Sequence, residues 1–117
     1  MAWRRDVFEI AVSADFRATY PKYDAKRRGY LSANGRWFVF RDHRADDWWN
    51  LTHVPTGYRA AWFRLRKSAL AAADALDATA VPWERISVEN CKAMSRRHKK
   101  AYGAARTAIA QIRDGEA

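Results

Sequence analysis

The residues with the greatest capacity for binding chemistry are the basic side chains between positions 92 and 113. This stretch holds seven Lys or Arg residues and no Asp or Glu. Clustered cations of this kind bind the phosphates of nucleic acids or an acidic protein face. We therefore predict that a partner contacts Lys92, Arg96, Lys99, Lys100 and Arg106. The alternative is that these cations form a solvated helix face, as runs of charge usually do, and this alternative accounts for the pattern about as well.

A second group of cations, Lys26, Arg27 and Arg28, lies just before a predicted hairpin, in a stretch that interleaves tyrosines with Lys and Arg. Tyrosine rings such as Tyr23 and Tyr30 can stack on bases while neighbouring cations hold phosphates. We predict a binding role for these three cations. The alternative, which we favour slightly, is a polar loop anchored by its tyrosines.

Aromatic and arginine side chains also share one face of a predicted strand. Alternation places Trp62, Arg64 and Arg66 opposite the face that carries the core residues. We expect Trp37 and Arg41 of the neighbouring hairpin strand on that same face. Trp and Arg are the residues that binding hot spots favour, so this surface is a third candidate interface. The alternative, slightly favoured, is a helix that covers this face and turns the rings into a second core layer.

The remaining reactive side chains do not form a recognisable catalytic or metal site. Cys91 and His98 are about two helical turns apart, which is too far for a nucleophile and its base. Two ligands also fall short of the three or four that zinc needs. The acidic pair at 46–47 indicates a turn, and Asp74 with Asp77 indicates a solvated helix end. We predict a non-catalytic protein with no metal site and no cofactor.

Positioning these groups requires strands in the first half of the chain and helices in the second. Alternating apolar residues predict strands at about 7–13, 29–33, 36–41, 48–54 and 58–65. Asn34-Gly35 predicts a hairpin with a type I′ turn, and Pro55-Thr56-Gly57 predicts a second tight turn. Residues 14–26 predict at most a short helical turn that Pro21 interrupts.

Helical spacing replaces this alternation after Lys67. It predicts a helix at about 67–78, a break at Pro82 and one long helix at about 88–113 with Ser87 as its N-cap. The apolar stripe of the long helix is expected at Val88, Cys91, Ser95, His98, Tyr102, Ala105, Ile109 and Ile112. Strands followed by two helices are typical of an α+β fold, with the helices packed on an antiparallel sheet of four to five strands.

Length and composition fit one basic domain spanning residues 1–117. The formal net charge is +9, and six Trp, five Tyr and five Phe supply material for a core. Cys91 is the single cysteine, which favours a reducing compartment. The N-terminus has no apolar signal region, and no stretch approaches the roughly 20 apolar residues of a membrane span. We therefore expect a cytoplasmic protein without membrane partners.

One segment of the chain resembles known DNA-binding domains. It consists of Trp48-Trp49-Asn50-Leu51-Thr52-His53-Val54-Pro55-Thr56-Gly57, followed by Phe63, Lys67, Ala69 and Ala72. It is similar to hairpin-then-helix segments of phage-encoded proteins, and in outline to the sheet plus helix of integrase arm-binding and plant AP2-type domains. This resemblance implies a sheet in the DNA major groove, with Arg64 and Trp62 facing DNA. The small size and high charge also resemble anti-CRISPR and other phage anti-defence proteins.

Together these features predict a small basic binding protein, encoded by a phage or mobile element. It would engage nucleic acid, or the machinery that handles nucleic acid, through a positive helix. The alternative is an inhibitor of the anti-CRISPR type that binds a bacterial immune complex by protein–protein contacts. The sequence leaves the partner and the oligomeric state open.

Overall fold

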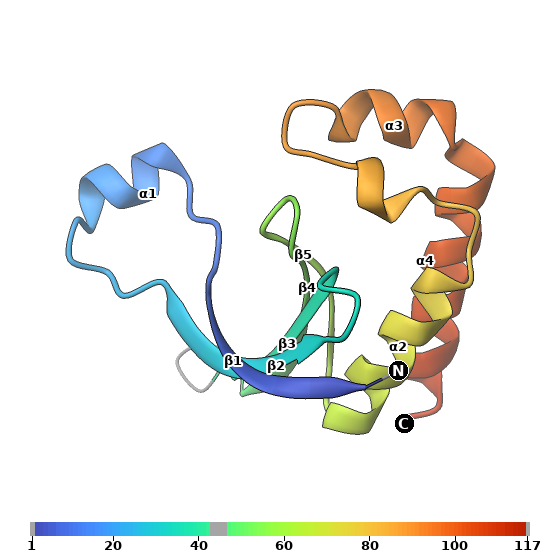
Figure 1. Ribbon diagram of the computed structural model, residues 1–117, viewed down its shortest axis with the longest axis horizontal. Helices are drawn as coiled ribbons and strands as arrows, with labels where there is room; N and C mark the ends of the chain where they lie inside the picture. The colour runs from blue at the N-terminus through green and yellow to red at the C-terminus, as the bar shows by residue number, and fades with distance from the viewer. Residues whose placement is uncertain (1, 43–46, 117) are drawn as a thin grey trace.

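The computed structural model describes residues 2–42 and 47–116 and contains a five-stranded antiparallel sheet (Figure 1). The strands lie side by side in chain order: β1 (Trp3–Glu9), β2 (Lys26–Ser32), β3 (Trp37–Asp42), β4 (Trp48–His53) and β5 (Tyr58–Phe63). The helical elements are α1 (Ala14–Thr19), α2 (Arg66–Asp77), a 3-10 turn η1 (Trp83–Arg85), α3 (Cys91–Arg97) and α4 (Lys99–Asp114). The predicted α+β class and antiparallel sheet are confirmed.

The first two strands begin earlier than predicted. β1 ends at Glu9 rather than at residue 13, because its seven residues pair with the seven of β2, from Trp3 opposite Ser32 to Glu9 opposite Lys26. The cations Lys26–Arg28 are therefore part of β2 and not of a loop before the hairpin. This difference places them in a regular register, where each side chain points to a defined face of the sheet.

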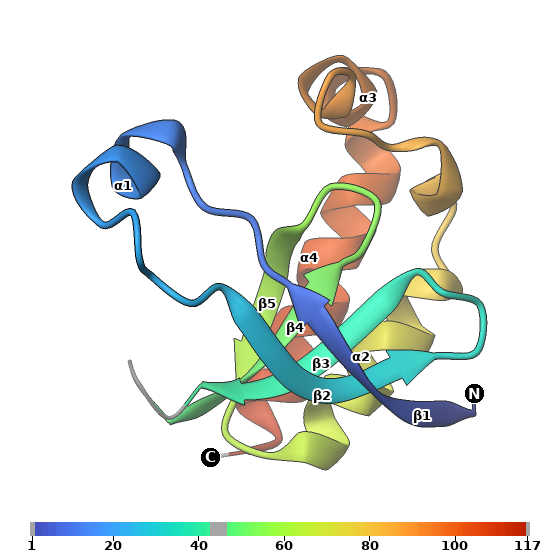
Figure 2. The same ribbon diagram turned by 60° about the vertical axis from the view of Figure 1, so that its left-hand side comes forward.

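The main core lies between one face of the sheet and α2, with α4 packed on α2 (Figures 1 and 2). Its large strand residues are Trp37, Val39, Leu51 and Phe63, all fully buried. The helix contributes the small side chains of Ala69, Ala72 and Ala73, together with Leu76, at helical spacing. Because alanine is small, α2 approaches the sheet closely, and each buried large side chain contributes about 1.5–3 kcal/mol.

Trp37 belongs to this helix-covered core and does not share a face with Trp62. Val39 pairs with Leu51, and Leu51 pairs with Ala61, so these three side chains point to the same face of the sheet. Trp37, two residues before Val39, shares that face, whereas Trp62, next to Ala61, points to the other one. The prediction was wrong because two alternating strands can be combined in either phase, and only their register decides which residues share a face. The alternative expectation, that a helix covers the rings, holds for Trp37.

The opposite face of the sheet is buried in its middle by β1. Phe38 and Phe40 lie on this face and are buried. The Phe8 ring lies 5.3 Å from the Phe38 ring, centroid to centroid. Figure 2 shows the ribbon of β1 and β2 curving across β3. The sheet therefore curls on itself, and only its margins leave polar and aromatic side chains open to a partner.

The Asn34-Gly35 hairpin is present, but its turn is not of type I′. Gly35 has a φ of 73° and donates its N–H to the Ser32 carbonyl at 2.9 Å, whereas positive φ among the described non-glycine residues is confined to Asp47. The Asn34 carboxamide instead accepts from the Arg36 N–H at 3.0 Å and donates to Asp77 at 2.9 Å. Asn34 therefore stabilises the turn through its side-chain hydrogen bonds and does not adopt the positive φ of a type I′ turn.

The helix predicted at 88–113 is broken at His98, which has φ −110° and ψ 37°. α3 turns away from the axis of α4 at this point (Figure 1). The bend keeps Cys91 and Met94 against the core, while the predicted stripe residue Val88 is exposed. It also relieves repulsion, because a continuous helix would stack Arg96 over the lysines three and four residues later. The helical spacing of apolar residues in the sequence reveals neither the packing of α3 on the core nor this repulsion.

His53 is a buried member of the core and not a ligand. Its Nε2 donates to the Trp83 carbonyl at 2.9 Å, and its Nδ1 lies 3.0 Å from the Thr56 hydroxyl. A carbonyl oxygen only accepts, so Nε2 carries a proton, and in the neutral ring Nδ1 is the hydrogen-bond acceptor. Burial holds the pKa of His53 below its ordinary value of 6.5; the Trp83 bond opposes this shift and the charge of Arg36 adds to it.

The lowered pKa of His53 predicts a loss of stability in mild acid. Below pH 6.5 the unfolded chain binds a proton on this histidine more readily than the folded protein does. The free energy of unfolding therefore decreases as the pH is lowered, by at most about 1.4 kcal/mol per pH unit. Urea unfolding between pH 7 and about pH 5 should show this slope. It should be shallower in His53→Gln; equal slopes in the wild type and this variant would contradict the assignment.

Candidate nucleic-acid interface

The sheet splits between β2 and β3, and this split opens a groove. The two strands pair at Tyr30–Val39 and Leu31–Phe38, whereas β2 stays paired with β1 as far as Lys26. Gly29 lies where the strands part. A Cβ atom on Gly29 would overlap the Val39 carbonyl oxygen and lie 2.9 Å from the Phe38 ring. Only a glycine permits this close approach before β2 leaves the sheet.

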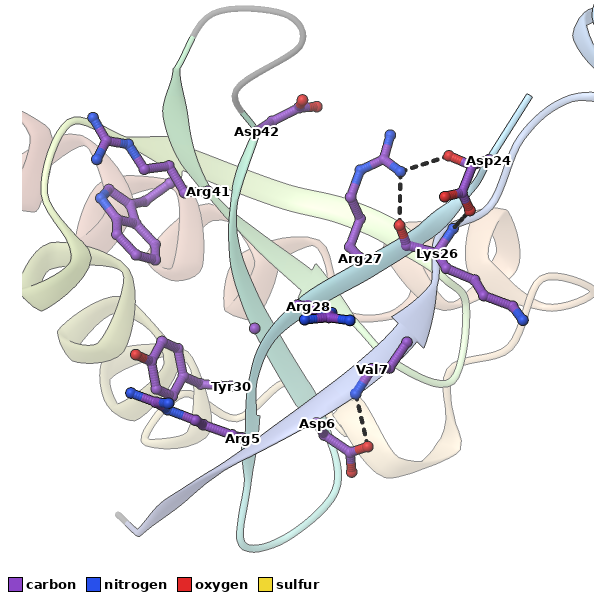
Figure 3. A pocket seen from close by; sticks show the side chains of 12 residues that line it. Arg5, Asp6, Val7, Asp24, Lys26, Arg27, Arg28, Tyr30, Arg41 and Asp42 are labelled. Carbon is purple, nitrogen blue, oxygen red and sulfur yellow. Dashed lines mark hydrogen bonds between the residues drawn. The ribbon is translucent and has the colours of Figure 1, made fainter.

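The resulting split-sheet groove has a volume of about 930 Å³ (Figure 3). Its walls carry five cations, three carboxylates and two aromatic rings, together with Val7 and Gly29. The cations are Arg5, Lys26, Arg27, Arg28 and Arg41, the carboxylates are Asp6, Asp24 and Asp42, and the rings are Tyr30 and Trp49. Positive charge exceeds negative charge by two, and the two rings lie among the cations.

Strand register brings these side chains together. Arg5 pairs with Tyr30 and Val7 with Arg28 across β1 and β2, so all four side chains share one face of the sheet. In Figure 3, Arg5 lies beside the Tyr30 ring and Arg28 lies over the middle of the groove. The opposite wall is Arg41, which is exposed and forms an ion pair with Asp47 at 2.7 Å.

Arg66, at the start of α2, contacts both aromatic rings of the groove. Its guanidinium lies 5.2 Å from the Tyr30 ring centroid and 5.9 Å from that of Trp49, and it donates to the Tyr30 hydroxyl at 2.9 Å. These contacts orient both rings at the groove margin. Arg64 lies elsewhere, 5.7 Å from the Trp48 ring. Trp48 and Trp49 point to opposite faces of β4, so Arg64 and Arg66 do not form the single surface that alternation predicted.

Arg27 differs from its neighbours because it is only 7% exposed. Its guanidinium donates to the carbonyls of Asp24 at 2.7 Å and Lys26 at 2.9 Å, and to the Tyr23 hydroxyl at 2.6 Å. Its Nε is buried without a hydrogen-bond partner among the described residues. Arg27 therefore anchors the base of the groove, while Lys26 and Arg28 are exposed along it.

The basic helix residues lie apart from the groove. Lys92 and Arg96 on α3, and Lys99, Lys100 and Arg106 on α4, are all exposed. α3 lies at the opposite side of the molecule from the β1–β2 pair (Figures 1 and 2), and none of these five side chains lines the groove. The predicted site residues therefore form separate surfaces: Lys26, Arg28 and Arg66 at the groove, Trp62 with Arg64 at the edge of the sheet, and the five helix cations elsewhere.

Arg5 and Trp49 are the groove residues that sequence reasoning missed. Arg5 lies before residue 7, where the first strand was predicted to begin, and its partner Tyr30 is 25 residues away in the chain. The Trp48-Trp49 doublet was the available signal, since one of two consecutive strand residues must point away from the core. Without the register, the sequence does not tell which ring meets which cation.

The chain matches no protein-family model, no curated protein and no solved structure. The chemistry of its own surface must therefore indicate its function. Within residues 2–42 and 47–116, no group of three or more His, Cys, Asp or Glu side chains is placed to hold a metal ion. No described helix is both long and apolar enough to cross a membrane.

Proposed function

We propose that this chain is a non-catalytic nucleic-acid-binding module that uses the split-sheet groove. The observation that carries the proposal is the convergence of Arg5, Arg28 and Arg41 with the rings of Tyr30 and Trp49 in one groove. Guanidinium groups bind phosphate oxygens in two-point contacts, and the rings offer faces on which bases stack. The net charge of +9 supports this role, because it draws a polyanion toward the protein.

The exposed helix cations act differently in this proposal. Lys92, Arg96, Lys99, Lys100 and Arg106 add long-range attraction, but no described aromatic ring is stacked against them. We therefore assign direct contacts to the groove and a general electrostatic contribution to the helices. The sequence-based hypothesis assigned the direct contacts to the helices, so matched variants can separate the two.

The test compares two double variants that remove equal charge. Arg5→Ala with Arg28→Ala should weaken binding of labelled DNA or RNA oligonucleotides on the order of tenfold at moderate salt, and should lower the salt slope by about 1.4 for single strands. Arg96→Ala with Arg106→Ala should weaken it much less, because those charges make no groove contacts. Fluorescence anisotropy between about 50 and 200 mM salt measures both quantities.

Two results would count against the proposal. Equal losses in both double variants would mean that only net charge matters, and no binding of DNA or RNA at low salt would remove nucleic acid as the ligand. In the second case the inhibitor hypothesis, with a protein partner at the same basic groove, becomes the better account.

A further inference from the structure

A second aromatic and cationic site lies at the same end of the sheet, on the opposite face. It is a cleft of about 400 Å³ lined by Trp48, Trp62, Arg64, Arg113 and Glu116, which we call the tryptophan cleft. A volume of this size is within the range of about 300–1,000 Å³ that small-molecule sites occupy. Both indoles are half-buried, so part of each ring remains open to a ligand.

The cleft is held in shape by Arg113. Its guanidinium stacks on the Trp62 ring at 3.5 Å from the centroid, and its Nε donates to the Trp62 carbonyl at 3.1 Å. The Trp48 ring lies 6.0 Å from that of Trp62 at an interplanar angle of 32°. Two indoles tilted by 32° to one another, and fixed before any ligand arrives, form a platform for a planar group at little entropic cost.

The charges around this platform suit an anionic ligand. Arg64 lies 5.7 Å from the Trp48 ring, and Arg59, outside the cleft lining, lies 5.7 Å from the Trp62 ring. With Arg113, three cations surround two rings. Glu116 is the one carboxylate among the cleft-lining residues, and it is already engaged, accepting from the backbone N–H groups of Arg64 at 3.1 Å and Leu65 at 2.9 Å. A planar base with an attached phosphate matches this combination of faces and charges.

The cleft and the groove meet at one end of the sheet. Trp48 in the cleft and Trp49 in the groove are consecutive residues of β4, and the arginines beside them, Arg64 and Arg66, flank one exposed residue, Leu65. A flexible chain that leaves the groove past Arg66 therefore reaches Arg64 by crossing one residue at the junction of β5 and α2.

We infer that the tryptophan cleft stacks a base of the same strand that occupies the groove, so that the ligand is single-stranded nucleic acid bent around this end of the sheet. This inference rests on the proposed function. A duplex does not satisfy the geometry, because its bases are already stacked and it is stiff over about 150 base pairs. A single strand bends freely and exposes its bases to aromatic rings.

The test uses labelled oligothymidylate and oligouridylate of about 4 and about 16 nucleotides, with a duplex of the longer length. Wild type should bind the long single strand at least tenfold more tightly than the short one or the duplex. Trp62→Ala should weaken the long strand about tenfold and leave the short strand nearly unchanged. Trp62→Phe keeps a ring and should recover most of the affinity. Tyr58→Ala, which removes an exposed ring of the same strand outside both sites, should behave as wild type.

Folding is checked by circular dichroism, and Arg64→Ala, at an exposed position, provides a second cleft variant if Trp62→Ala is unstable. The inference is overturned if both cleft variants bind the long strand as wild type, or if the duplex binds as tightly as the single strand, while the groove variant loses binding; the groove then acts alone. If no oligonucleotide binds wild type at low salt, the proposed function itself fails.

Discussion

Replacing Gly29 with alanine should lower the free energy of unfolding by about 3 kcal/mol, at the upper end of overpacking effects. The added Cβ would overlap the Val39 carbonyl oxygen and approach the Phe38 ring to 2.9 Å and the Phe40 Cβ to 3.0 Å. One of these contacts is with backbone, so the strands must separate to relieve it. Because Gly29 lies where the groove begins, oligonucleotide binding should weaken as well. Urea unfolding and anisotropy measure the two effects.

Gly103→Ala is the matched control for that substitution. Gly103 lies within α4, and no atom lies within 4 Å of a Cβ added there. Alanine should therefore stabilise the helix by about 0.5–1 kcal/mol, the usual gain over glycine. A Gly29→Ala protein as stable as wild type would show that β2 and β3 do not approach as closely as described.

Replacing Asp77 with alanine should also be severe, with a loss of about 2–4 kcal/mol. The Asp77 carboxylate accepts from the Trp37 indole at 2.9 Å, from Asn34 at 2.9 Å and from Arg36 at 3.3 Å. Its side chain is only 17% exposed, so it is not the solvated helix end that we expected from the sequence. Its loss leaves the indole N–H of a fully buried tryptophan without its acceptor.

Two further variants show what Asp77 contributes. Asp77→Asn keeps an acceptor for Trp37 but removes the charge opposite Arg36, and should lose less stability than the alanine variant. Glu84→Ala removes a 52% exposed carboxylate 3.9 Å from Arg36, and should change the free energy of unfolding by less than about 1 kcal/mol. If Glu84→Ala and Asp77→Ala lower the free energy of unfolding equally, Asp77 contributes no more than an ordinary surface charge.

Local patterns in the sequence were sufficient for the elements of this fold. Alternation located all five strands, and helical spacing located α2 to within a residue or two. Both kinds of pattern depend on a few neighbouring residues. Where an element end depends on a distant partner, prediction failed: β1 is bounded by its pairing with β2, and the break at His98 by the packing of α3 against the core.

The candidate site was predictable as a set of residue types but not as an arrangement. Lys26, Arg28 and Arg66 were singled out, yet three separate surfaces could be drawn with equal reason. Register decided among them, since the pairing of Arg5 with Tyr30 and the splitting of β2 from β3 are set by contacts between segments far apart in the chain.

The sequence by itself determined a basic α+β protein with most strands before the long helices and with many arginine and aromatic side chains. Only the tertiary structure decided that Trp37 is core, that Trp48 and Trp49 serve opposite faces, and that the groove opens at Gly29. Composition and periodicity are local properties of the chain, whereas the side chains that share a surface are chosen by strand register and by the curl of the sheet, which depend on the whole fold.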